Sequence, residues 1–138
     1  MSVLKILAAL ILILSPALSK SQKVSITPVP ISVDRSFTNI VGMCQDNKGF
    51  IWLADNYNGL LRYDGSNLIS YKSNPRNPNS LVSDNLECVY AGSKGNIWIG
   101  SGAGNCLNKY DGRSMARYTT AQGLINTAIN QIIEDSHG

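Results

Sequence analysis

The stretch GFIWLADNYNGLLRYDG at residues 49–65 returns in closely related form as GNIWIGSGAGNCLNKYDG at residues 95–112. The first glycine and the tryptophan of each copy recur at a spacing of 46 residues, and the closing Tyr-Asp-Gly recurs after one inserted residue. A repeat of this length with a tryptophan landmark is typical of β-propeller blades or similar arrays. The landmarks shared by the two copies are Gly49, Trp52, Tyr63, Asp64, Gly65, Gly95, Trp98, Tyr110, Asp111 and Gly112.

Each repeat contains short apolar runs separated by turn residues, which predicts four strands. The predicted strands cover residues 40–44, 50–54, 59–63 and 67–72 in the first repeat, and 87–91, 96–100, 106–110 and 114–119 in the second. The second run of the first repeat, FIWLA, is apolar at every position, which indicates a strand buried on both faces. Asp64-Gly65 predicts a hairpin turn with two positive φ angles. The sequence therefore predicts an all-β fold of four-stranded antiparallel blades.

A third repeat begins near residue 124. Residues 129–133 align with residues 86–90, and Gly138 aligns with Gly95. Propellers close with about four to eight blades. We therefore expect about two blades, the first strand of a third, and an incomplete ring, with the chain representing the N-terminal part of a longer protein or a truncated remnant of one.

The N-terminus has the features of a secretory signal peptide. Lys5 precedes an apolar run at residues 6–14, and Pro16 is followed by the small-x-small residues Ala17-Leu18-Ser19. The apolar run is shorter than the ~18–20 residues that span a bilayer, so a retained membrane anchor is the weaker alternative. The predicted organisation is a signal peptide at 1–19, an extended lead-in at 20–36 and a partial propeller at 37–138.

Composition excludes several classes of function. The net charge is +3 and the basic residues are scattered, which argues against a nucleic-acid partner. Three cysteines, Cys44, Cys88 and Cys106, leave at least one thiol unpaired and have no metal-binding spacing. We predict no catalytic residue, no metal site and no cofactor, and no membrane span beyond the signal peptide.

Several residues are candidates for a functional role. Trp52 and Trp98 could stack on sugars, but their apolar strands favour packing between blades. Asp46 and Asp135 precede a glycine in Asp-x-x-Gly turns, where an aspartate bonds back to nearby amides. The glycine-rich residues 100–105 lack a Walker lysine and predict a hairpin turn. His137, the only histidine, is expected in an exposed turn.

Loop surface remains for binding. The candidate loops are residues 55–58, residues 101–105, and the SNPRNPN loop, where Arg76 could pair with the carboxylate of an acidic sugar. The individual ligand-binding residues stay unassigned.

The strings QDNKGFIWLADNYNGLLRYDG, NSLVSDNLECVYAGSKGNIWIG and QGLINTAINQIIEDSHG together resemble the two-component regulator propeller repeat. The resemblance covers residues 37–138. It implies the N-terminal periplasmic sensor region of a hybrid two-component histidine kinase, without its kinase. Two positions depart from the repeat, Ala54 in place of glycine and Ala91-Gly92 in place of an acidic pair, and both are expected to relax turns.

The resemblance implies an exported binding module that senses an oligosaccharide in signal transduction and is not itself an enzyme. The alternative is a fragment of a propeller lectin or of a polysaccharide-active lyase or hydrolase. Two blades would also leave open apolar faces and unpaired edges, which favour self-association.

Overall fold

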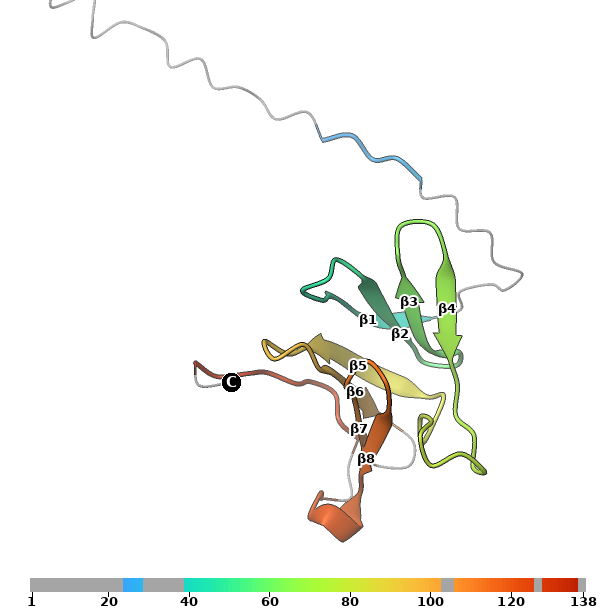
Figure 1. The fold of residues 1–138 in the computed structure, drawn as a ribbon, viewed down its shortest axis with the longest axis vertical. Helices are drawn as coiled ribbons and strands as arrows, with labels where there is room; N and C mark the ends of the chain where they lie inside the picture. Colours follow the sequence, from blue (N-terminus) through green and yellow to red (C-terminus); the bar gives the residue numbers. More distant parts are fainter. Residues whose placement is uncertain (1–23, 29–38, 103–105, 126–127, 137–138) are drawn as a thin grey trace, which may run out of the picture.

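The computed structural model describes residues 24–28, 39–102, 106–125 and 128–136. Two four-stranded antiparallel sheets follow one another along the chain, each in the order of its strands (Figure 1). The first sheet contains β1 (Ile40–Gln45), β2 (Ile51–Asp55), β3 (Gly59–Tyr63) and β4 (Leu68–Tyr71). The second contains β5 (Leu86–Ala91), β6 (Ile97–Ser101), β7 (Leu107–Tyr110) and β8 (Met115–Tyr118), and a short 3-10 turn, η1 (Thr120–Gln122), follows it.

All eight predicted strands are present, with ends that differ by at most two residues. The predicted fold class is confirmed, because the described residues form two separate four-stranded antiparallel sheets and no closed ring. Within the same residues, no helix is long and apolar enough to cross a membrane.

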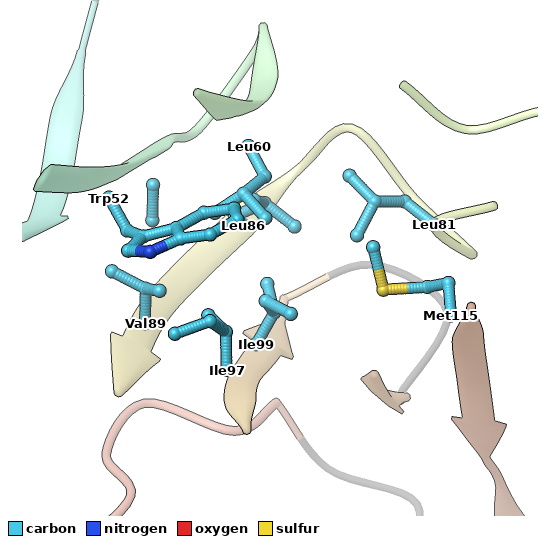
Figure 2. Close-up of a cluster of buried hydrophobic side chains, with 9 residues drawn as sticks. Trp52, Leu60, Leu81, Leu86, Val89, Ile97, Ile99 and Met115 are labelled. Atoms are coloured by element: carbon cyan, nitrogen blue, oxygen red, sulfur yellow. The ribbon is translucent and has the colours of Figure 1, made fainter. Parts of the chain in front are cut away.

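The core lies between the two sheets. Trp52 is 2% exposed and packs with Leu60 of the first sheet against strands of the second. Figure 2 shows the Trp52 ring beside Leu86 and Val89, with Ile97 and Ile99 beyond them. A sheet buries a face only against another layer, and here residues of both sheets and of the β4–β5 connection form this core. The buried cluster comprises Trp52, Ala54, Leu60, Leu81, Leu86, Val89, Ile97, Ile99 and Met115.

The β3–β4 turn differs from the prediction of two positive φ angles at Asp64-Gly65. The Asp64 N–H donates to the Asn67 carbonyl at 3.2 Å, which places Gly65 and Ser66 at the centre of the turn. Gly65 has a φ of +100°. Asp64 instead precedes the turn, and its Oδ1 accepts from the N–H groups of Ser66 and Asn67. Asp111 does the same in the β7–β8 turn.

Ala54 was expected to relax a turn, and this is wrong. Ala54 lies within β2, pairs with Gly42 and Leu60, and is fully buried. Its counterpart Gly100 lies within β6. The difference between the repeats at this position therefore concerns packing on a sheet face and leaves the turn chemistry unchanged.

The first strand predicted for a third blade does not pair in a sheet. Residues 128–136 form no strand, because a strand requires a neighbouring ladder and no described segment provides one. The segment still contacts the second sheet, where the Ile129 N–H donates to the Ser101 carbonyl at 3.3 Å. The predicted signal peptide, most of the lead-in and His137 lie outside the described residues. The expectations for them therefore stay predictions.

Candidate functional site

Three loops meet where the two sheets adjoin. Asn56 of the β2–β3 loop donates its side-chain amide to the Leu86 carbonyl at 3.1 Å and to Glu87 Oε1 at 3.0 Å. Asn85 donates to Asn56 Oδ1 at 2.9 Å, and its carbonyl accepts from the Gly102 N–H at 3.2 Å. We call Asn56, Asn85, Glu87 and Gly102 the loop cluster. Amides both donate and accept hydrogen bonds, and here these bonds join the β2–β3 loop to Asn85 and to β5.

Asp55 supports the β2–β3 loop from inside the fold. Its Oδ1 accepts from the N–H groups of Tyr57 at 2.8 Å and Asn58 at 2.9 Å, and the residue is fully buried. Burial raises the pKa of Asp55, but hydrogen bonds from Tyr57, Asn58 and Asn39 outweigh it, so the pKa lies below its ordinary value. The carboxylate is therefore ionised at neutral pH and engaged by its own loop.

Tyr57 is the exposed aromatic residue of the same loop. It is 66% exposed, and its neighbour Asn56 belongs to the loop cluster. A tyrosine combines a flat apolar ring with a hydroxyl group, the combination that stacks on a sugar ring and hydrogen bonds its substituents. Of the other loop candidates, Arg76 is exposed on the β4–β5 connection, and residues 103–105 lie outside the described part of the chain.

The two tryptophans are held differently. Trp52 donates its ring N–H to Asp46 Oδ2 at 2.8 Å, while Asp46 Oδ1 accepts from the N–H groups of Lys48 and Phe50. Asp46 is thus engaged by its turn and by the tryptophan. Gly92 replaces this aspartate in the second repeat, so the carboxylate that would accept from Trp98 is missing there.

A basic side chain lies over each tryptophan. The Arg62 guanidinium is 4.4 Å from the centre of the Phe50 ring and 5.8 Å from that of Trp52. Lys109, its counterpart, places its Nζ 5.1 Å from the Trp98 ring centre. Cations are attracted to aromatic faces at such distances, and here they stabilise the packing of β2 on β3 and of β6 on β7.

A cavity of about 540 Å³ lies between the second sheet and residues 132–135. Trp98 lines this cavity, whereas its counterpart Trp52 in the first sheet is covered by the second sheet. Glu134 closes one side, because its carboxylate accepts from the Ser93 N–H and Oγ at 2.8 Å each. The lining residues are Tyr90, Gly92, Lys94, Asn96, Trp98, Leu107, Lys109, Ile132, Ile133, Glu134 and Asp135.

The three cysteines are free thiols. Burial, followed by the charge of Asp46, raises the pKa of Cys44 to about 11. Burial also raises the pKa of Cys88 and of Cys106. Because the thiolate is the reactive form, these groups are weak nucleophiles at neutral pH.

Arg117 is an important residue that the sequence did not single out. Its guanidinium donates to the carbonyls of Ser80 at 2.9 Å, Asn77 at 2.8 Å and Leu81 at 3.1 Å, and so ties the β4–β5 connection to β8. Ser70 takes its place in the first repeat, so the repeat carried no signal for this role. The contacts of Glu134 join segments 41 residues apart, and the sequence did not predict them either.

Comparison with solved structures places the fold among propellers of two kinds. The chain is 26% identical, with a TM-score of 0.51, to the extracellular domain of a protein assigned as the hybrid two component system BT3049 from B. thetaiotaomicron, over 61% of this chain and 12% of that one. It also matches an inactive H270A virginiamycin B lyase from Staphylococcus aureus, solved with quinupristin, at 17% identity and a TM-score of 0.51, over 63% and 29% of the two chains. No family model matches the chain, and no curated protein does.

These matches support a partial propeller fold for the two sheets. The chain spans about an eighth of the length of the sensor domain. The likeness to the lyase concerns the fold alone, because the identity is low.

Proposed function

We propose that this chain supplies blades of the ligand-sensing propeller of a periplasmic hybrid two-component sensor, and that its loop cluster contacts an oligosaccharide. The observation that carries the proposal is the pair of stacked four-stranded blades, combined with the 26% identity to a sensor's extracellular domain. Signalling would follow from ligand-dependent movement of blades relative to the rest of the sensor, with phosphoryl transfer carried out elsewhere.

We propose a binding role and no catalytic one. The Asp55 carboxylate is turned into its own loop by hydrogen bonds from Tyr57 and Asn58. Asp46 is engaged by Trp52 and by its turn. These two carboxylates therefore serve structure, while the 66% exposed ring of Tyr57 is suited to binding.

A glycan array probed with the exported chain tests the proposal. We expect binding to a restricted class of oligosaccharides, with an affinity that falls about ten-fold or more in Tyr57→Ala, since stacking side chains at binding sites contribute about 1 to 3 kcal/mol. Lys48→Ala, in an exposed turn between β1 and β2, is the control and should bind as the parent does. Equal binding of all three proteins, or of none, would contradict the proposal.

A further inference from the structure

Each sheet presents one face to the other sheet and one face away from it. Met43, Ile51 and Leu53 lie on the side of the first sheet opposite to Trp52 and Ala54, because neighbouring residues of a strand point to opposite faces. Met43 is 69% exposed. We call these three residues the Met43 face.

The counterparts of the Met43 face are buried in the second sheet. Val89 pairs with Ile99 as Met43 pairs with Leu53. Val89, Ile97 and Ile99 are 8%, 2% and 0% exposed, and all three belong to the core between the sheets. The first sheet therefore leaves Met43 exposed and Ile51 and Leu53 partly exposed, at the positions whose counterparts the second sheet buries.

The second sheet shows the converse. Trp98, Leu107 and Lys109 line the cavity on its outer side and form what we call the Trp98 face. Their counterparts in the first sheet are Trp52, Leu60 and Arg62, of which Trp52 and Leu60 are 2% and 0% exposed beneath the second sheet. Beside Trp52 the second sheet inserts Tyr110, with ring centres 5.7 Å apart. Trp98 contacts the aromatic ring of Tyr118 in its own sheet, with ring centres 6.0 Å apart.

We propose that a second copy of this chain docks its Met43 face on the Trp98 face of the first, reproducing between chains the interface that joins the two sheets within one chain. The internal interface argues for this occupant, because it shows which surface fits a tryptophan face of this kind, and the chain presents the corresponding surface with Met43 exposed and Ile51 and Leu53 partly exposed. Tyr63 of the second copy would take the place beside Trp98 that Tyr110 has beside Trp52.

Such a contact joins two different surfaces, so it is heterologous and repeats from copy to copy until it closes into a ring. Each copy would add two blades. Rings of about four to eight blades then correspond to about two to four copies.

Residues 128–136 must move for docking to occur. The contacts that hold them to the second sheet include hydrogen bonds of Ile129 and of Glu134. The cavity lies beneath the stretch that includes residues 132–135. Docking therefore exchanges the contacts of this segment, which forms no strand, for burial of the two apolar faces against each other. Burial of apolar surface is the dominant favourable term in most protein association.

Complementary variants test the proposal. The full chain is expressed with export and purified through a C-terminal tag as wild type, Met43→Glu and Trp98→Glu, and masses are measured by light scattering across concentration. Wild type is expected to associate with rising concentration, whereas each variant alone stays monomeric. Mixing the two variants should give a discrete one-to-one dimer of twice the monomer mass, because one retains the Trp98 face and the other the Met43 face.

Ser66→Glu, which adds one charge in the exposed β3–β4 turn, is the matched control and should associate as wild type does. Circular dichroism establishes that each variant folds, and Leu107→Glu replaces Trp98→Glu if the latter does not. A monomeric wild type, a mixture that stays monomeric, or variants that associate like wild type would each overturn the proposal. The test uses no saccharide, so its failure leaves the proposed sensing role intact.

Discussion

Gly92 stands where the first repeat has Asp46, and this one difference decides how each tryptophan is held. The two turns have the same backbone geometry, since Gly49 N–H donates to Asp46 O at 3.0 Å and Gly95 N–H to Gly92 O at 2.9 Å. A Cβ built on Gly92 would lie 3.4 Å from Trp98 Nε1. An aspartate therefore fits at position 92, and its carboxylate can reach the indole N–H.

Gly92→Asp is expected to stabilise the protein by about 1 kcal/mol, through a hydrogen bond to a charged acceptor and reduced freedom of the unfolded chain. Gly92→Ala provides the second effect without the first, so it is the control. Thermal melts of the three proteins measure the difference. An aspartate variant no more stable than the alanine variant would contradict the assigned role of the Asp46 position.

Asp55 makes the stability of the first sheet depend on pH. Because its pKa is lowered in the folded protein below the ordinary value of 3.8, its stabilising contribution is complete above that value and is lost as the pH falls through the lowered pKa. The urea midpoint of wild type should exceed that of Asp55→Asn at pH 7, and the gap should narrow below about pH 4. A gap that is independent of pH would show that the ionised carboxylate contributes nothing.

At the scale of elements, Gly59 fixes the entry into β3. Its φ is +75°, and an added Cβ would lie 2.6 Å from the Tyr71 carbonyl oxygen. Gly65 also has a positive φ but has nothing within 4 Å of the added atom. Substitution of Gly65 therefore measures backbone strain alone, whereas substitution of Gly59 adds a steric clash.

Gly65→Ala should cost about 1 kcal/mol, the strain of a left-handed backbone. Gly59→Ala should cost about 3 kcal/mol or more, because the clash with backbone adds to that strain. Chemical denaturation of both variants checks the order. Equal losses would mean that β3 and β4 separate easily at this point.

Arg117 ties the β4–β5 connection to the second sheet, which predicts how that connection responds to protease. Arg117→Gln leaves several carbonyls of residues 74–81 without their charged donor, so local opening should become easier by about 1.4 kcal/mol or more. Trypsin cleavage after the exposed Arg76 should then be about ten-fold faster or more. Arg113→Gln, in an exposed turn, is the control, and equal cleavage rates in both variants would contradict the role of Arg117.

The strands were predictable because each one occurs in two aligned copies of the repeat. Apolar runs such as FIWLA also indicate a strand from local sequence alone. The centre of the β3–β4 turn was predicted wrongly. Aspartate is common both just before a turn and at its centre, so the sequence did not show which of these places Asp64 takes. The Asn56–Asn85–Glu87 contacts were not predictable, because they join residues about 30 positions apart. Two of the three side chains also differ between the repeats, since Gly102 corresponds to Asn56 and Val41 to Glu87.

At the scale of the whole molecule, two blades share one core, and neither sheet buries its second face against another sheet among the described residues. The same arrangement explains the shared geometry of the two repeats, the partly exposed Met43 face, and the Trp98 face, which adjoins residues 132–135 in place of a further sheet. It also leaves the loop cluster at the junction of the sheets, where small relative movements of the blades would change the spacing of Asn56 and Glu87. That position is suited to coupling ligand binding to blade movement.

Hydrogen–deuterium exchange of the exported chain, with and without the saccharide selected on the array, tests the sensing role most directly. The account predicts slower exchange in residues 55–59 and 83–87 and at Gly102, which contain the loop cluster and its supports, with little change in the β3–β4 turn at residues 64–67. Protection confined to other segments, or no protection with any bound saccharide, would contradict it.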